Sequence, residues 1–233
     1  RDPLWSRGLG DVYKRQAVPP SSVQPAPPRS EPFSEVPSGP PESMVAESWF
    51  DDAVFIGDSR TEGLALYDGL GGASYYAHKG LMVSTVDSTP AVRVSGKKIS
   101  VMQALRKKKF GKVYVMLGVN ELGWGSSKTF VEDYSKVTDE IKKYQPEAKI
   151  YLQSILPVTA KKSDSSGVYT NTKIESYNQA IQKIAKDRKV RYLAVNTAVS
   201  DAAGCLPEDA STDGVHLNAR YCGKWCEYLR AHT

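Results

Sequence analysis

Short apolar runs alternate with longer segments of helical spacing along the chain from Asp51 onward, and this alternation limits the possible folds. The strand-like runs are Ala53–Gly57, Ala73–Ala77, Lys112–Gly118, Lys149–Ile155 and Arg191–Val195. The helical segments between and after them are Val101–Phe110, Lys128–Tyr144, Lys173–Asp187 and Ala219–Ala231. Strands that alternate with helices form a parallel sheet covered on both faces. The pattern predicts an α/β fold, a three-layer α/β/α sandwich around a mainly parallel five-stranded sheet, whose ligands bind beyond the carboxyl ends of the strands.

Chain length and composition exclude several other classes of protein. At 233 residues, the chain is long enough to bury a core without disulfides or metals. It contains no run of about 18 apolar residues, so no transmembrane segment is expected. Its formal net charge of +5 comes from 31 basic and 26 acidic groups, mostly intermixed. This charge is too small and too evenly spread to suggest a nucleic-acid partner.

The cysteines leave two alternatives open. Cys205, Cys222 and Cys226 cannot form a disulfide framework, and with so few histidines nearby they make a poor zinc set. Cys222 and Cys226 are one helical turn apart. One disulfide from Cys205 to either of them fits the sequence, and so do three free thiols.

The N-terminal region differs in composition from the rest of the chain. Residues 1–16 lack an initial methionine and the apolar core of a signal peptide, so we interpret them as a non-native, adapter-derived leader. Nine of the 25 residues from Ala17 to Pro41 are proline, which predicts an extended or disordered linker over residues 17–47. One folded domain should follow over residues 48–233. A spacer of this kind fits an extracellular or cell-surface protein that it tethers, and an ordinary disordered leader of a cytoplasmic protein is the alternative.

Ser59 stands where the first strand should give way to a helix. It follows Ala53–Gly57 directly after Asp58, so the sheet's carboxyl edge should carry it. Its backbone N–H would lie in the first turn of the helix, unpaired and able to donate to an anion. Asp58 or Ser59 could equally be a plain helix cap.

Asp213 and His216 precede the last helical segment. Histidine is the usual general base near neutral pH, and an aspartate three residues earlier on a turn can accept a hydrogen bond from its ring. A loop histidine beside a helix-capping aspartate is the alternative. No third residue has the spacing of a metal ligand, so no metal site is predicted.

Asn120 and Gly80 follow two further strands. An asparagine amide at this position could donate to a developing oxyanion, and Gly80 could offer a backbone N–H that is easily approached. Both are also common turn residues at strand ends. Together with Ser59 and the Asp213–His216 pair, they supply a nucleophile, a base, an orienting carboxylate and oxyanion donors, the groups needed for acyl transfer through a serine ester.

The chain resembles the SGNH (GDSL-like) hydrolase superfamily of serine esterases and acylhydrolases over about residues 50–230. The matching blocks are FIGDS around Ser59, Gly80, GVNE around Asn120 and DGVHL around His216. The resemblance implies a flavodoxin-like SGNH hydrolase domain over residues 48–233. It also implies that Ser59 is the nucleophile, His216 the base and Asp213 its partner, and that the Ser59 and Gly80 N–H groups and the Asn120 side chain form the oxyanion hole. No cofactor is required.

Two residues depart from the family pattern. Arg60 replaces the usual leucine after the nucleophile, and Glu121 replaces the usual aspartate after the asparagine. Arg60 could place a cation next to the nucleophile and favour a polar or acidic substrate. It could also be a surface arginine that pairs with Glu62 or Asp58. We predict Arg60, Trp124 and Glu121 as candidate substrate-binding residues.

The substrate is expected to be a small-molecule or glycan ester. Trp124, Tyr75, Tyr76 and Tyr169 could be platforms for sugar rings, or they could pack in the core, and Pro157–Thr172 is expected to be a polar loop at the rim. We predict removal of short acyl groups, acetyl above all, from carbohydrate or cell-wall substrates. A general short-chain or aryl esterase or thioesterase, an acyltransferase, and a catalytically silent glycan-binding module are the alternatives. The oligomeric state does not follow from the sequence.

Overall fold

The structure, a computed structural model, describes residues 44–67 and 69–233. The predictions for the leader and for most of the linker lie outside these residues. The backbone N–H of Val45 donates to Arg230 O at 2.9 Å, and Arg230 Nε donates back to Val45 O at 2.9 Å. A short 3-10 helix, η1 (Glu47–Phe50), follows and buries Phe50. The chain is therefore attached to the folded region before residue 48, a few residues earlier than the predicted boundary.

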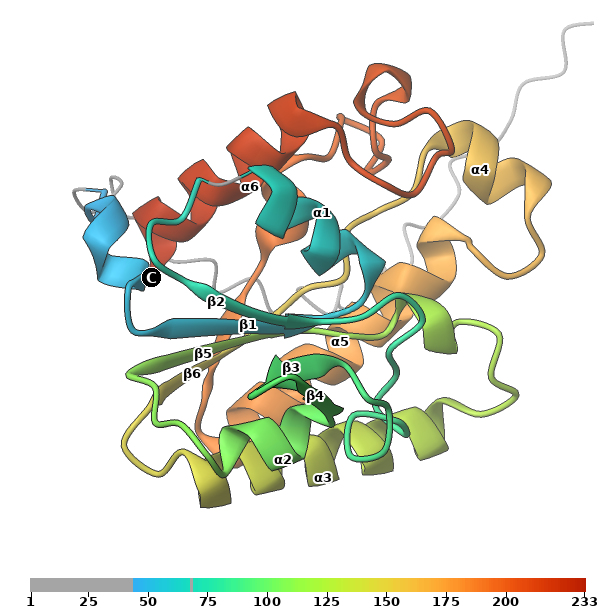
Figure 1. The fold of residues 1–233 in the computed structure, drawn as a ribbon. Helices are drawn as coiled ribbons and strands as arrows, with labels where there is room; N and C mark the ends of the chain where they lie inside the picture. The colour runs from blue at the N-terminus through green and yellow to red at the C-terminus, as the bar shows by residue number, and fades with distance from the viewer. Residues whose placement is uncertain (1–43, 68) are drawn as a thin grey trace, which may run out of the picture. The chain divides into compact units, whose positions relative to one another are not determined.

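A parallel five-stranded sheet forms the centre of the fold (Figure 1). Its strands are β1 (Ala53–Gly57), β2 (Ser74–Ala77), β5 (Lys112–Met116), β6 (Lys149–Gln153) and β7 (Arg191–Leu193). Their order across the sheet is β2-β1-β5-β6-β7, and every neighbouring pair is parallel. All five predicted strands are present. β5, β6 and β7 end two residues before the end of the predicted runs, where the chain turns into the loops at the carboxyl edge.

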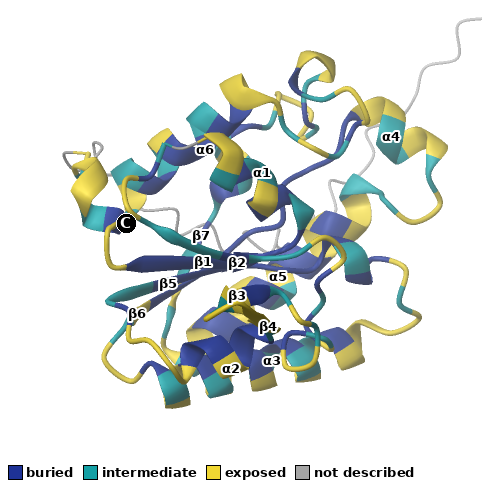
Figure 2. Ribbon diagram, in the orientation of Figure 1, coloured by how far each residue is buried: buried dark blue, intermediate teal, exposed yellow. Residues whose placement is uncertain are grey.

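Helices cover both faces of the sheet, so the predicted α/β sandwich is confirmed (Figure 1). The first face carries α2 (Val101–Leu105), α3 (Ser127–Tyr144) and α5 (Asn171–Arg188), and the second carries α1 (Ser59–Tyr67) and α6 (Ala219–His232). Alternate residues of β1 serve the two cores: Val54 and Ile56 face the first, and Phe55 faces the second. Figure 2 shows the strands as the most deeply buried part of the fold.

The second face is held by a row of aromatic rings that runs across the strands. Phe55 stacks on Tyr114 with ring centroids 4.6 Å apart, and Tyr114 stacks on Tyr151 at 4.5 Å. These residues are register partners on β1, β5 and β6, so the parallel pairing itself places the rings in contact. Such stacking adds about 0.5–1.5 kcal/mol per pair beyond the area that the rings bury.

The helix predicted over Val101–Phe110 ends at Leu105. It begins with a capping box between Ser100 and Gln103. It ends where the side chain of Gln145, the residue after α3, donates to Leu105 O and Lys108 O at 2.7 Å each. These bonds satisfy carbonyls at and just beyond the helix end that would otherwise lack a partner.

A short helix and a two-stranded hairpin are among the elements that were not expected from the sequence. The predicted loop Pro157–Thr172 contains α4 (Ala160–Ser165), which the hydroxyl of Thr159 caps. Ahead of α2, β3 (Val92–Val94) pairs antiparallel with β4 (Lys97–Ile99). The turn between them has positive φ at both central residues, Ser95 and Gly96, as a tight hairpin turn requires.

Cys205, Cys222 and Cys226 are all free thiols. Of the two alternatives for the cysteines, the structure therefore has the one without a disulfide. Over the described ranges, no helix is long and apolar enough to cross a membrane.

Candidate active site

Ser59 is the first residue of α1 at the carboxyl edge of the sheet. Only Asp58 separates it from the end of β1 at Gly57. A Cβ atom on Gly57 would overlap the side chain of Thr61 and lie 2.9 Å from Met116 O, so only glycine allows this close turn. The backbone N–H of Ser59 makes no hydrogen bond to any described residue. Both the hydroxyl and the N–H of Ser59 are thus available at this edge.

Ser59, His216 and Asp213 form one chain of hydrogen bonds. Ser59 Oγ lies 2.8 Å from His216 Nε2, and His216 Nδ1 lies 2.5 Å from Asp213 Oδ2. With Asp213 ionised, Nδ1–H donates to the carboxylate, which leaves Nε2 to accept from the serine hydroxyl. The three residues predicted from separate blocks of sequence are therefore in direct contact, in the geometry that lets a histidine take a proton from a serine.

The second oxygen of Asp213 fixes the turn that carries His216. Asp213 Oδ1 accepts from the N–H of Val215 at 2.9 Å, from the N–H of His216 at 2.8 Å and from Ser211 Oγ at 3.0 Å. Partial burial acts to raise the pKa of Asp213, but the hydrogen bonds from His216, Val215 and Ser211 outweigh it and hold the pKa well below its usual range. Asp213 is therefore ionised at neutral pH. Ser211 was not predicted as a site residue, because its only signal in the sequence is its position two residues before the aspartate.

Gly80 and Asn120 lie on two loops that are joined by a hydrogen bond. Asn120 belongs to the 3-10 helix η2 (Val119–Glu121), and its Nδ2 donates to Leu81 O at 3.2 Å. Gly80 precedes Leu81 and has a φ of +77°, a conformation that favours glycine, and its N–H makes no hydrogen bond to any described residue. The bond to Leu81 orients the Asn120 amide and leaves its second N–H as a donor. Ser59, Gly80 and Asn120, which follow three neighbouring strands of the sheet, thus each keep an N–H donor without a partner among the described residues.

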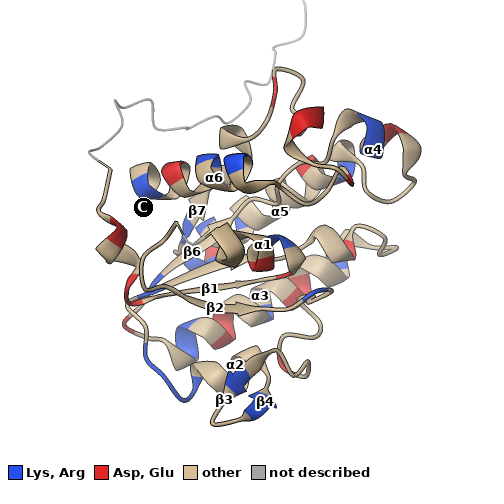
Figure 3. Ribbon diagram, turned by 45° about the horizontal axis from the view of Figure 1, so that its top comes forward, with Lys and Arg blue, Asp and Glu red and all other residues tan. Residues whose placement is uncertain are grey.

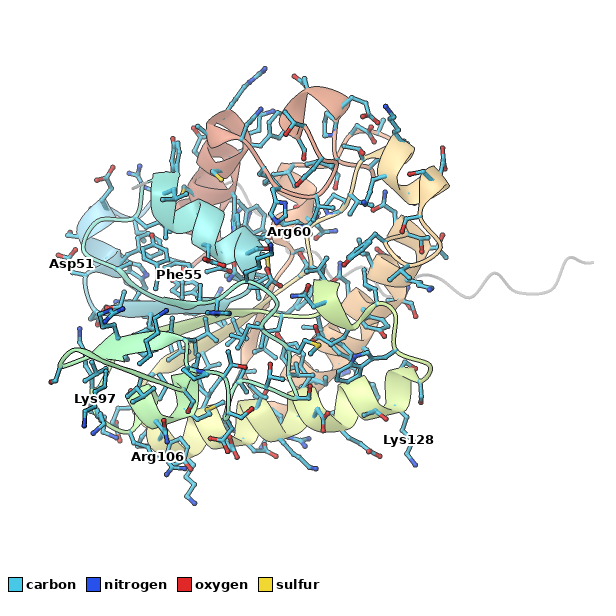
Figure 4. The ribbon with its side chains drawn as sticks, turned by 45° about the vertical axis from the view of Figure 1, so that its right-hand side comes forward. Asp51, Phe55, Arg60, Lys97, Arg106 and Lys128 are labelled. Atoms are coloured by element: carbon cyan, nitrogen blue, oxygen red, sulfur yellow. The ribbon has the colours of Figure 1, made fainter. Side chains whose placement is uncertain are left out.

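Arg60, the second residue of α1, is buried, and Figure 4 labels it at the beginning of this helix. Its guanidinium donates to the backbone carbonyls of Val215 at 3.0 Å, Pro157 at 2.8 Å and Leu156. Burial, opposed by the charges of Asp58 and Asp213, lowers the pKa of Arg60 to about 10. The expectation of a surface arginine is wrong, and with its donors taken up by carbonyls Arg60 is not presented to a substrate. It instead connects α1 to the loop after β6 and to the turn that carries His216.

Glu121 is also fully buried, although it was predicted as a candidate substrate-binding residue. Its Oε2 accepts a long hydrogen bond from Val83 N at 3.4 Å, and its Oε1 has no partner among the described residues. Burial, together with a smaller contribution from the charge of Asp58, raises the pKa of Glu121 to about 8. Asp58 is buried as well, and burial raises its pKa to about 6. Both carboxyl groups have raised pKa values and are buried, so neither is exposed to a substrate.

The aromatic residues considered as platforms are divided between core and rim. Tyr76 is buried in the first core, and Tyr75 stacks on Phe55 at 5.5 Å, so both belong to the sheet. Trp124 and Tyr169 pack against the same core as Tyr76 but stay half-exposed. Of the four, Tyr76 is buried, and Tyr75, Trp124 and Tyr169 each keep part of their side chain exposed.

A polar cleft of about 430 Å³ opens next to Asp213. α4 supplies Lys161, Lys162 and Ser165, and the chain ahead of His216 supplies Glu208 and Thr212. Gly214, with a φ of +83°, packs so tightly on α4 that a Cβ there would lie 2.7 Å from Lys162 Cβ. The cleft therefore shares a wall with the turn that holds Asp213. The polar segment at this rim was predicted from the sequence, but α4, the helix that lines the cleft, was not.

A serine hydrogen-bonded to a histidine–carboxylate pair, at the carboxyl edge of a parallel sheet, is the arrangement that ester hydrolysis through an acyl-serine requires. The sequence profile of the GDSL-like Lipase/Acylhydrolase family matches residues 55–220. The chain belongs to this family, and it is a carboxylic ester hydrolase of the GDSL/SGNH type.

Solved structures share the fold at low sequence identity. A GDSL-like lipase from Bacteroides thetaiotaomicron has a TM-score of 0.56 and 17% identity, over 80% of this chain and 88% of its own. An acetylxylan esterase from Geobacillus stearothermophilus has a TM-score of 0.58 and 13% identity, over 76% of this chain and 91% of its own. A carbohydrate acetylesterase from Sinorhizobium meliloti has a TM-score of 0.54 and 15% identity, over 76% and 96%. No curated protein matches the chain in sequence.

Proposed function

We propose that Ser59 is the nucleophile of this esterase and His216 its general base. Asp213 orients the histidine and stabilises its protonated form. The observation that carries this assignment is the hydrogen-bond chain from Ser59 Oγ to His216 Nε2 at 2.8 Å and from His216 Nδ1 to Asp213 at 2.5 Å. The N–H groups of Ser59 and Gly80 and the side chain of Asn120 form the oxyanion hole.

The reaction proceeds in two steps. Ser59 Oγ attacks the ester carbonyl carbon while its proton passes to His216 Nε2, and the carbonyl oxygen becomes an oxyanion held by the N–H donors. The intermediate collapses, the C–O bond to the alcohol breaks, and the alcohol leaves with the proton from His216. Water then attacks the acyl-serine with His216 as base, which releases the carboxylic acid and restores Ser59.

The substrate we propose is a carbohydrate that carries short acyl groups, with acetyl preferred. The side chains of His216 and Asp213 are 48% and 52% exposed, so the reacting ester can approach from open solvent. The adjoining cleft is lined by hydroxyl, lysine and carboxylate side chains, which suit the hydroxyl groups of a sugar better than a long acyl chain. The fold shared with the acetylxylan esterase and the carbohydrate acetylesterase supports the proposal at the level of architecture.

The first test is hydrolysis of p-nitrophenyl acetate, butyrate and octanoate by the wild type and by Ser59→Ala. We expect acetate to be the best substrate and the variant to be inactive. Activity retained by Ser59→Ala would disprove the assignment of the nucleophile. A clear preference for octanoate would disprove the acyl-group assignment and leave the nucleophile standing.

The second test separates sugar recognition from chemistry. Lys161→Gln removes a cation from the cleft, and Lys183→Gln removes one from the far side of α5 as a control. With an acetylated xylo-oligosaccharide, Lys161→Gln should raise KM by roughly 2- to 10-fold, the effect of one hydrogen bond, and leave the rate on p-nitrophenyl acetate unchanged. Equal KM values for both variants would argue against the cleft as a sugar site.

A further inference from the structure

The positive charge of the chain is concentrated in one segment. The residues from Ser88 to Asn120 contain eight lysines and arginines and no aspartate or glutamate. The formal net charge of the whole chain is only +5, so the remainder of the chain is net negative. The even spread of charge inferred from the totals does not hold along the sequence.

The fold gathers these cations at one end of the molecule. Figure 3 shows the lysines and arginines around the β3–β4 hairpin and α2, and Figure 4 shows Lys97 and Arg106 at the end where Asp51 leads into β1. Lys128, in the first turn of α3, lies at the other end (Figure 4). We call the first group of cations the hairpin group: Arg93, Lys97, Lys98 and the run Arg106–Lys109.

A groove of about 410 Å³ adjoins this group at the amino ends of β6 and β7. Its lining includes four cations and no carboxylate. These cations, the groove group, are Lys142, Lys149, Lys189 and Arg191. Gln145 lines the same groove and bonds Leu105 O and Lys108 O, so the groove directly adjoins the run Arg106–Lys109. The two groups together make up the basic edge.

The cations of the basic edge are not neutralised. Within the described part of the chain, none of them forms an ion pair with an acidic side chain. Lys109 and Lys142 donate instead to the neutral carbonyls of Tyr144 and Arg188, at 2.6 and 2.7 Å. By contrast, Lys183 on α5 is paired with Asp187 and Lys128 on α3 with Glu132.

Most of the acidic residues close to this end already have partners. Asp52 is paired with Lys112, Asp139 is paired with Arg188, and the carboxylate of Asp51 accepts the N–H of Gly72 at 2.9 Å. Glu47 and Glu147 are exposed. Unpaired cations that lie close together make the local electrostatic potential positive, so this edge attracts anions.

We propose that the basic edge binds a linear polyanion without bases, a sugar or polyol polymer with repeated phosphate or carboxylate groups. The successive cations of the groove group and the hairpin group would each pair with an anionic group along such a chain. Because the edge lies at the amino ends of the strands and Ser59 at the carboxyl ends, a bound polymer would leave the active site free.

The covered aromatic rings at this edge argue against a single-stranded nucleic acid. Lys112 and Lys149 lie over the ring of Trp49 at 4.1 and 5.2 Å, and Arg106 lies over the ring of Tyr144 at 4.5 Å. Proteins that bind single strands need ring faces on which bases can stack, and these rings are already occupied.

The exposed apolar residues argue against a membrane surface. The large exposed hydrophobic side chains of the described residues are Met44, Leu66, Tyr67 and Val168, and none belongs to the hairpin or the groove. Peripheral attachment to a bilayer normally combines basic residues with large hydrophobic side chains that enter the lipid, and the basic edge exposes none of these among the described residues.

The proposal can be tested with long-chain inorganic polyphosphate as the probe. The edge variant carries Lys97→Gln, Lys98→Gln, Lys107→Gln and Lys189→Gln. The control carries Lys128→Gln, Lys136→Gln, Lys183→Gln and Lys186→Gln, which removes the same charge from α3 and α5. At low salt, we expect the edge variant to bind about tenfold more weakly or worse, with a flatter dependence of log Kd on log salt concentration, while the control stays close to the wild type. The p-nitrophenyl acetate activity of both variants should be unchanged, which shows that they are folded.

Several results would overturn the proposal. One is the absence of polyphosphate binding by the wild type at low salt, and another is an equal loss in the edge variant and the control. Tenfold tighter binding of an oligothymidylate with the same number of phosphates would identify a nucleic-acid partner instead. Capture by phosphatidylglycerol vesicles without polyphosphate binding would identify a membrane. None of these results bears on the assignment of Ser59, so the two proposals fail separately.

Discussion

Asn120 and Glu121 are neighbours in sequence, but their side chains lie in different surroundings. Asn120 is half-exposed and tied to Leu81 O, while Glu121 is buried with one carboxyl oxygen unpartnered. The amide can therefore act on a substrate, and the carboxyl group can act only on the protein around it. Asn120 therefore gives a prediction about the reaction rate, and Glu121 gives one about the pH dependence of stability.

Removal of the Asn120 amide should slow the reaction without unfolding the protein. Loss of one oxyanion donor costs about 10²–10³ in kcat, so we expect Asn120→Ala to lose that order of activity on p-nitrophenyl acetate, with a much smaller change in KM. Ser59→Ala and His216→Ala should lose more. Steady-state kinetics beside thermal melting would check this, and wild-type turnover in Asn120→Ala would remove Asn120 from the oxyanion hole.

Glu121→Gln should change how stability depends on pH. Burial raises the pKa of Glu121 from an ordinary value near 4.5 to about 8 in the folded protein. Between these values the folded state keeps a proton that the unfolded state has lost, so stability falls as pH rises. Glutamine mimics the protonated form and should remove this fall, which is on the order of a few kcal/mol at 1.36 kcal/mol per pKa unit.

Urea unfolding at pH 5, 6.5 and 8 would measure the effect of Glu121→Gln. The advantage of the variant over the wild type should grow with pH and level off above about pH 8. Asp58 is present in both proteins, so its own titration largely cancels in the comparison. A constant difference across this range would mean that Glu121 titrates near its ordinary pKa.

Arg60 connects three elements, so its replacement should affect stability and catalysis together. Its donors reach carbonyls after β6 and in the turn that carries His216, while its backbone lies next to Ser59 in α1. Arg60→Met would leave these carbonyls without partners at about 1–3 kcal/mol each. We expect a loss of several kcal/mol in the free energy of unfolding and a lower kcat from a displaced Ser59–His216 pair.

Chemical denaturation and kinetics at a temperature where the variant is fully folded would separate the two effects of Arg60→Met. Lys183→Gln, on the outer side of α5, serves as a control for loss of a cation. If stability fell and the kcat of the folded protein did not, Arg60 would hold the fold without positioning the serine.

The regular elements could be predicted because their burial leaves a pattern in the sequence. Every residue of β1 is buried, and in α5 the stripe of Ile174, Tyr177, Ile181 and Ile184 lies in the core as expected. The β3–β4 hairpin and α4 carry too few residues to form such a pattern. The end of α2 is bonded by Gln145, which is 40 residues away from Leu105 in sequence, and no local signal contains that contact.

The sequence predicted the residues of the candidate site better than it predicted the burial of the residues next to them. Ser59, Asp213 and His216 each follow or precede a recognisable element, so parallel topology brings them to one edge. The burial of Arg60 and Glu121 was not predictable, because charged residues are mostly exposed and nothing in their neighbouring residues marks these two as exceptions. Their partners come from distant loops that only the folded chain assembles.

Cys222 and Cys226 report on the unfolding of the whole molecule. Both thiols lie in the second core, where burial raises the pKa of Cys222 to about 11 and that of Cys226 to about 12, while Cys205 is half-exposed. Since the thiolate is the reactive form, the two buried thiols should react with Ellman's reagent only as fast as the domain opens. We expect one thiol per native chain to react quickly and the other two to follow at the rate of unfolding, with all three reacting at once in denaturant.

Reductant should leave Tm unchanged, because the structure has no disulfide in which these cysteines take part. Fewer than three reactive thiols in denaturant would show that a disulfide forms in solution, and three fast thiols in the native chain would show that α6 does not stay packed on the sheet.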